Sequence, residues 1–238
     1  MSLTKIRKSL RRYASQQKAK ILQRFFKTGK GEYGEGDKFI GVVVPDTRKV
    51  AKLHSNLPLT DCIKLLKSEI HEERLLSLLI LIQKFEKADL ILKDKIFKVY
   101  LANTKYINNW DLVDLSAPNV VGAYLLDKSR NILRSLAKSK SLWERRIAIV
   151  STHFLIRNKQ YKDTLKIAEM LLKDNHDLIH KAVGWMLREV GKRELRPLEK
   201  FLSKHKKVMP RTMLRYAIER FPESKRKSYL LAKKGNIG

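Results

Sequence analysis

Cysteine is nearly absent from this chain, since Cys62 is the single one in 238 residues. One thiol forms no disulfide and no thiolate metal cluster within the chain, so we expect a reducing, cytoplasmic compartment. Long apolar runs are missing as well, and none reaches the roughly 18 residues that a membrane-spanning helix needs. The basic N-terminus has no apolar core or cleavage site, and we interpret it as a first helix and not as a targeting signal.

Acidic residues are scarce beside basic ones. The chain has 24 Asp and Glu against 52 Lys and Arg, a net charge of +28 and a pI of about 10.2. Hydrophobic residues make up 43% of the sequence, which is enough for a folded core and excludes a disordered basic tail. The charge implies a polyanionic partner, and nucleic acid is the commonest one. An anionic membrane surface is the main rival.

Glycine and proline are few, with ten and six residues, and strand-like alternation is nearly absent. Apolar residues instead recur at three- and four-residue spacing, which indicates helices. The predicted helices span 74–85, 88–103, 141–158, 161–173, 177–193 and 198–207. Thr60 and Asp177 stand where N-caps are expected. Only the segment 39–45, FIGVVVP, looks extended, and it is too isolated to form a sheet.

About a dozen short helices joined by short linkers predict an all-α fold, a solenoid of HEAT-like antiparallel helix pairs of roughly 35 to 45 residues each. No composition shift marks a boundary, so we expect one domain over 1–238. Basic segments recur along successive helices, for example in KHKK at 204–207 and RTMLRY at 211–216. A solenoid would align them as a stripe on its concave face, and such a stripe can follow a phosphate backbone.

Three local patterns carry little functional weight. GKGEYGEGD at 29–37 contains G-x-G-x-x-G, but a helix precedes it and no helix follows directly, so we interpret it as a flexible loop. His176 and His180 are four residues apart, yet no third ligand is evident, and we interpret them as solvated helix-surface histidines. Cys62 is most simply a small core residue.

The segment NNWDLVD at 108–114 places acid beside a large aromatic in a basic chain. In a helix beginning at Asn109, Trp110 and Asp114 are four residues apart and share a face, while Asp111 points elsewhere. Asp111 lies in the first turn, where the helix dipole favours a carboxylate. From the sequence alone, a core tryptophan beside a salt-bridged acid explains the pair better than a functional site does.

Five segments in order give the chain a resemblance to the AlkD-type DNA alkylation repair family, HEAT-like DNA glycosylases that remove alkylated purines. The segments are GEYGEGDKFIGVVVPDTRKVAK, NNWDLVD, WERRIAIV, IHKAVGWMLREVGKR and MPRTMLRYAIERFPESKR. Together they cover nearly the whole length. The resemblance implies a right-handed α–α superhelix with a concave basic groove.

The resemblance also implies roles for individual residues. The family's catalytic aspartate falls on Asp114 and its two active-site tryptophans on Trp110 and Trp185. An aromatic position near the N-terminus falls on Phe25 or Phe26, and neither carries a hydroxyl for hydrogen bonding. We expect the DNA-binding residues to be Arg146, Arg188, Lys181, Arg211 and Arg215.

The implied activity is monofunctional hydrolysis of the N-glycosidic bond of cationic N3- or N7-alkylated purines in duplex DNA. The expected partner is double-stranded DNA with alkylated bases, bound by a monomer in the nucleoid, without cofactor or metal and without membrane contact. Two alternatives stay open, a non-catalytic DNA-binding scaffold of the same fold and a helical repeat that binds RNA or protein.

Overall fold

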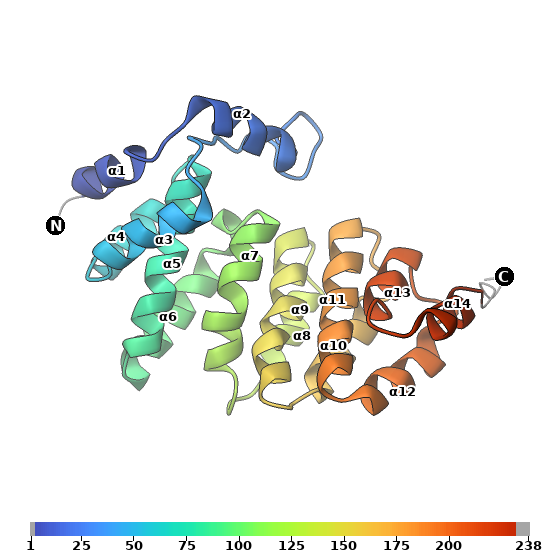
Figure 1. The fold of residues 1–238 in the computed structure, drawn as a ribbon. Helices are drawn as coiled ribbons and strands as arrows, with labels where there is room; N and C mark the ends of the chain where they lie inside the picture. Colours follow the sequence, from blue (N-terminus) through green and yellow to red (C-terminus); the bar gives the residue numbers. More distant parts are fainter. Residues whose placement is uncertain (1–2, 232–238) are drawn as a thin grey trace. The chain divides into compact units, whose positions relative to one another are not determined.

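The fold comes from a computed structural model that describes residues 3–231. The chain divides into two compact units, residues 1–124 and 125–238, and both are helical (Figure 1). The described residues contain no strand, only an isolated parallel bridge between Lys38 and Ile70. The all-α prediction is therefore confirmed. No helix within residues 3–231 combines the length and the apolarity needed to cross a bilayer.

The first unit is arranged around one central helix, α5. Its helices are α1 (Leu3–Arg11), α2 (Gln16–Phe25), α3 (Val44–Leu53), α4 (Leu59–Leu66), α5 (His71–Lys87), α6 (Leu90–Ala102), η1 (Thr104–Tyr106), α7 (Trp110–Ala117) and the π-helical turn η2 (Pro118–Gly122). Helices α3, α4, α6 and α7 all pack against α5. The residues from Leu75 to Ile82, all apolar except Ser77, are buried on every side, as a helix surrounded by others requires.

The extended segment 39–43 is held by a side chain and not by a second strand. The carboxylate of Glu72, at the start of α5, accepts hydrogen bonds from the backbone N–H groups of Ile40 at 3.1 Å, Gly41 at 2.8 Å and Val42 at 3.2 Å. Gly41 has a φ of +81°, which favours glycine. Its Cα lies against the backbone of Ser15, the N-cap residue of α2, which leaves no room for a side chain. Glu72 thus satisfies the backbone donors that a sheet would otherwise satisfy.

The second unit consists of two helical layers. Its helices are α8 (Asn131–Ala137), α9 (Leu142–Arg157), α10 (Lys162–Met170), α11 (Asp177–Arg193), α12 (Leu195–His205), α13 (Arg211–Ala217) and α14 (Glu223–Leu231). Helices α9, α11 and α13 pack side by side, while α8, α10 and α12 pack against them. Each of the sequence pairs α8–α9 and α10–α11 contributes one helix to each layer, as in HEAT-like repeats.

Several local predictions need correction. Thr60 lies inside α4, and Pro58 occupies the N-cap position. Asp177 is the first residue of α11, and His176 is the cap. Segment 39–45 is shorter than predicted, because α3 already begins at Val44. The predicted helix at 74–85 begins three residues earlier, at His71, because the polar residues before Arg74 are buried and continue the helix.

The predicted loop and the histidine pair are also defined more closely. The loop at 29–37 is confirmed as a loop after α2, and the carboxylates of Glu32 and Glu35 accept hydrogen bonds from Gly29 and Gly31. His176 and His180 are half-buried and not simply solvated. Nδ1 of His176 accepts from the N–H of Leu178 at 3.1 Å. No group of metal-binding side chains occurs among residues 3–231.

Candidate active site

Helix α7 presents Trp110 and Asp114 from its first two turns. Asn109 precedes the helix in an extended conformation, and its Oδ1 accepts a hydrogen bond from the N–H of Trp110 at 2.8 Å. The predicted start of this helix is thus confirmed. The π-helical turn η2 follows α7 directly, and such turns are frequent near functional sites.

Trp110 and Asp114 line one cavity of about 480 Å³, entirely within the first unit. Most of its wall is apolar. The lining residues are Leu22, Phe25, Phe26, Phe39, Val42, Val43, Val44, Pro45, His71, Glu72, Leu75, Trp110, Asp111, Asp114 and Leu115. An apolar cavity with a few convergent polar groups is the usual form of a small-molecule or reactive site.

Three aromatic rings surround the indole of Trp110. Phe26 stacks on it with ring centroids 5.2 Å apart and planes at 29°, and Phe25 meets it edge-on at 5.9 Å. The indole Nε1 donates to the hydroxyl of Tyr33 at 3.3 Å. The Gly-rich loop therefore supplies a hydroxyl next to Trp110, although Phe25 and Phe26 carry none. These contacts fix the orientation of the indole.

A chain of buried polar side chains supports the cavity from behind. His71 bonds to Asp111 through Nε2 at 2.8 Å and to Asp37 through Nδ1 at 3.1 Å. Arg74 donates to Asp37 at 2.6 Å, and the amide of Asn109 donates to the same carboxylate at 3.3 Å. All five side chains are buried. This buried network, Asp37–His71–Asp111 with Arg74 and Asn109, ties the start of α5 to the start of α7.

The charges in the buried network favour a protonated imidazole between two carboxylates. Burial on its own would lower the pKa of His71, but the charge and hydrogen bond of Asp111 raise it above its usual value, helped by Asp37. Burial works against ionisation of Asp37 as well, yet the hydrogen bond from His71 and the charge of Arg74 lower its pKa. Each charge thereby stabilises the other.

Asp111 is more than a first-turn acid. Its Oδ1 accepts from the N–H of Leu112 at 2.8 Å, as expected near a helix start, but its Oδ2 binds His71. It also borders the same cavity as Asp114. The prediction that Asp111 points away from the site is therefore wrong, because the partner on α5 draws its carboxylate toward the cavity.

The other predicted site residues belong to the second unit and are described within it. Trp185 lies on α11, half-buried, with its ring centroid 5.7 Å from that of His153 on α9. His153 in turn lies 4.0 Å from the carboxylate of Glu189. Burial lowers the pKa of His153, which disfavours a positive charge on the ring beside Trp185.

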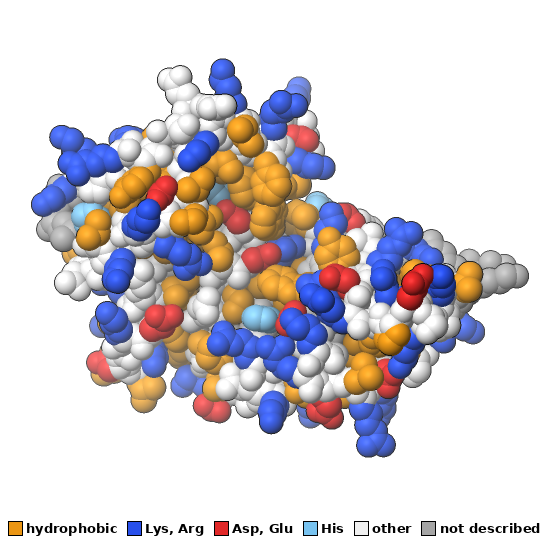
Figure 2. Space-filling model, in the orientation of Figure 1, with side chains coloured by type: hydrophobic (Ala, Val, Ile, Leu, Met, Phe, Trp, Pro, Cys, Tyr) orange, Lys and Arg blue, Asp and Glu red, His pale blue; other side chains and the backbone are white. Residues whose placement is uncertain are grey.

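The predicted DNA-binding cations differ in exposure. Arg146 is buried, and its Nη1 donates to the carbonyl of Leu178 at 2.5 Å. Arg188 pairs with Glu219, and Lys181 pairs with Asp177 at 2.7 Å. The guanidinium of Arg211 donates to the carbonyl of Leu230 at 2.8 Å, and Arg215 is exposed. Arg215 is thus exposed, Arg188, Lys181 and Arg211 are half-buried, and Arg146 is buried. Figure 2 shows basic side chains spread widely over the visible face and not gathered in one patch.

Sequence reasoning missed the residues that hold the cavity together. His71 and Glu72 come from a segment that carried no functional pattern, and Tyr33 and Asp37 lie in the Gly-rich loop that was interpreted only as flexible. One signal was present, because HEER at 71–74 puts four polar residues directly before the apolar stretch LLSLLILI at 75–82. Charged residues at the edge of such a run are buried only when they are paired.

Comparison with known proteins assigns the chain to a family. No curated protein matches it. A solved structure described as a predicted DNA alkylation repair enzyme from Enterococcus faecalis has the same fold, with a TM-score of 0.70 and 16% identity over 88% of this chain and 97% of the other. The family model for the DNA alkylation repair enzyme matches residues 6–221. The chain therefore belongs to the DNA alkylation repair enzyme family.

Proposed function

We propose that the protein is a monofunctional DNA glycosylase that hydrolyses the N-glycosidic bond of cationic N3- and N7-alkylated purines in duplex DNA. The observation that carries the proposal is the cavity of the first unit, where the carboxylate of Asp114 and the indole of Trp110 share an apolar wall. Membership of a DNA alkylation repair family supplies the substrate class.

The lesion itself explains why a single carboxylate suffices. An N3- or N7-alkylated purine carries a positive charge, so it leaves as a neutral base without an acid to protonate it. As the C1′–N bond breaks, its electron pair goes to the base and positive charge builds on the deoxyribose. Asp114 stabilises that oxocarbenium charge and accepts a hydrogen bond from the water that attacks C1′.

The aromatic residues contribute through their faces. An indole face attracts a cation by about 0.5–2 kcal/mol, depending on how fully the pair is desolvated. Trp110 and Trp185 would each favour the positive charge that develops on the sugar as the bond breaks, and so would raise the rate more than the affinity for the intact lesion. Arg146, Arg188, Lys181, Arg211 and Arg215 would hold the phosphates, with Arg146 turning from Leu178 to do so. The chain would act as a monomer on the nucleoid.

The variant Asp114→Asn tests the proposal. It keeps the size of the side chain and removes the charge, so we expect release of 7-methylguanine from methylated DNA to fall at least about 100-fold. Duplex binding should change little. The matched control is Asp127→Asn, an exposed aspartate of the second unit with the same change in charge. Free bases are measured by mass spectrometry.

The same experiment decides between an enzyme and a scaffold. A non-catalytic DNA-binding protein would bind methylated duplex without releasing base, in wild type and variant alike. Full activity of Asp114→Asn would leave the fold and the family membership intact and overturn the catalytic role of Asp114. Stronger binding of RNA than of duplex DNA would favour the RNA-binding alternative.

A further inference from the structure

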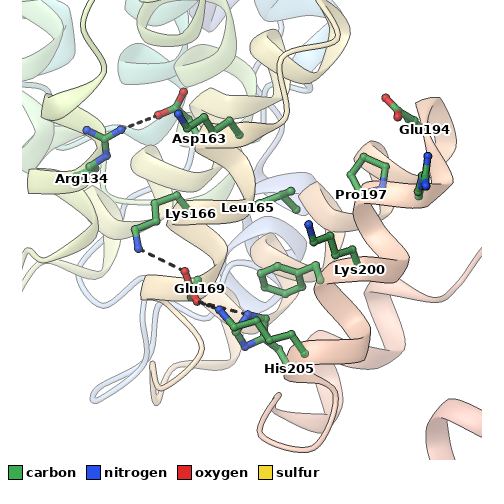
Figure 3. A pocket seen from close by; sticks show the side chains of 13 residues that line it. Arg134, Asp163, Leu165, Lys166, Glu169, Glu194, Pro197, Lys200 and His205 are labelled. Carbon is green, nitrogen blue, oxygen red and sulfur yellow. Dashed lines mark hydrogen bonds and ion pairs between the residues drawn. The ribbon is translucent and has the colours of Figure 1, made fainter.

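The second unit contains a groove that the proposed activity does not use. It lies between α10 and α12, beside α8, and encloses about 830 Å³ (Figure 3). Its apolar lining comes from Leu165, Pro197 and Phe201. Figure 3 shows Lys166 and Glu169 on one side of it and Lys200 and His205 on the other. We call it the α10–α12 groove.

Basic residues line the groove in two regular rows. Arg196, Lys200 and Lys204 recur every fourth residue along α12, and Lys162 and Lys166 do the same along α10. At a rise of 1.5 Å per residue, successive cations of a row are about 6 Å apart on one face of the helix. Such rows suit a partner whose own charges recur at regular intervals.

The acidic residues of the groove are largely neutralised within it. Asp163 accepts from Arg130 at 2.8 Å and from Arg134 at 3.2 Å. Glu169 lies 2.9 Å from Lys204, 3.4 Å from Lys166 and 3.5 Å from His205. Glu194 is exposed at the rim.

Three cations remain available to a ligand. No ion pair within residues 3–231 involves Lys162, Arg196 or Lys200, and all three side chains are exposed. They come from both walls of the groove. A ligand lying along it would therefore meet positive charge on each side and an apolar floor below.

We propose that the α10–α12 groove binds the sugar-phosphate backbone of a second DNA segment. Helices α10 and α12 belong to the layer opposite the one formed by α9, α11 and α13, which bears Trp185, Arg188 and Arg215. The groove is thus a separate DNA contact within the second unit. A polynucleotide matches it better than an acidic peptide, because a backbone with a phosphate on every nucleotide can reach Lys162, Arg196 and Lys200 on both walls.

The test compares two triple variants of the full chain. The groove triple variant combines Lys162→Gln, Arg196→Gln and Lys200→Gln, and removes three charges from the groove. The control triple variant combines Lys138→Gln, Lys140→Gln and Lys207→Gln, and removes three charges from exposed lysines of the same unit outside the groove. Each protein is saturated with an unmodified duplex tethered to a surface, and capture of a second labelled DNA is measured against salt concentration. One arm uses a single strand and the other a duplex.

We expect wild type and the control triple to capture the second DNA and the groove triple to lose at least 10-fold in affinity for it. The logarithmic salt slope should fall by about 2 for a single strand or nearly 3 for a duplex, since each phosphate contact contributes about 0.7 or 0.9. If the single strand is captured more tightly than the duplex, the groove binds single-stranded DNA, and if the duplex is captured more tightly, it binds duplex DNA.

Three results would overturn the proposal. They are equal losses in both triple variants, no second capture by wild type, and displacement of the second DNA by polyglutamate at equal charge concentration. The last would assign the groove to acidic peptides. None of these measurements requires base release, so an inactive enzyme would not affect them.

Discussion

Gly41 shows how one residue joins the wall of the cavity to α2, the helix that ends at Phe25 and is followed by Phe26. Its φ of +81° is strained for any other residue, and an added Cβ would lie 2.0 Å from the carbonyl oxygen of Ser15. That carbonyl belongs to the backbone that starts α2. We expect Gly41→Ala to lower the free energy of unfolding by about 3 kcal/mol, measured by urea denaturation.

Gly31 supplies the matched control. Its φ is +78°, almost the same, but nothing lies within 4 Å of the position its Cβ would take. Gly31→Ala should cost only the backbone strain, about 1 kcal/mol. Equal losses of unfolding free energy in the two variants would mean that the clash with Ser15 adds nothing to the cost of Gly41→Ala.

At the residue scale, NNWDLVD predicted more than composition did. Helical spacing put Trp110 with Asp114, and both line the cavity, but it wrongly set Asp111 apart, since Asp111 lines the same cavity. What spacing could not supply was the partner of Asp111. His71 stands 40 residues earlier, and pairing over such a distance is set by tertiary packing, which has no local pattern.

At the scale of elements, the buried network couples the starts of α5 and α7. The folded-state pKa of His71 is raised above its usual 6.5, so its contribution to stability is fully present below about pH 6.5 and is lost as pH rises through the folded value. The groups facing the ring are Asp37, Asp111 and Arg74. We expect His71→Gln to cost about 3 kcal/mol near pH 6 and less at pH 9, measured by urea unfolding.

His176 gives a control of opposite sign. Burial lowers its pKa, and its neutral Nδ1 caps α11 by accepting from Leu178. Its contribution to stability should therefore be fully present above about pH 6.5 and be lost as pH falls through its lowered folded pKa, so His176→Gln should cost more at pH 9 than at pH 5. A cost of His71→Gln that rises with pH in the same way would show that the imidazole is neutral in the fold.

Helices were predictable where apolar spacing was strong, and their starts were less so. The range 177–193 agrees with α11 at both ends. The start of α5 was missed because HEER is polar, and polarity at a helix start normally signals solvent. The extended segment 39–43 was found, but its support by Glu72 was not, since a single carboxylate that replaces a strand leaves no periodic trace.

At the scale of the whole molecule, composition predicted the class of partner but not the surface that meets it. The excess of basic residues agrees with a DNA alkylation repair family. The right-handed superhelix, the single domain over 1–238 and the concave basic groove stay predictions. Charge counted along a chain does not say which helices share a face. The α10–α12 groove could not be predicted from the sequence, because it depends on the fold bringing the cations of α10 and α12 to the same cavity.

The net charge of +28 also bears on whether the protein selects alkylated over unmodified DNA by binding or by bond cleavage. A protein that contacts 6–10 phosphates loses about 10³- to 10⁵-fold in duplex affinity between 50 and 200 mM salt. An alkylated purine adds one positive charge to the DNA, so a basic protein gains no general attraction to it.

We expect methylated and unmodified duplexes to bind Asp114→Asn with affinities within about 3-fold of each other and with equal salt slopes, measured by fluorescence anisotropy. Selectivity would then reside in the lability of the cationic lesion and not in binding. A methylated duplex bound 100-fold more tightly than its unmodified counterpart would contradict this and assign the selectivity to a pocket that recognises the base.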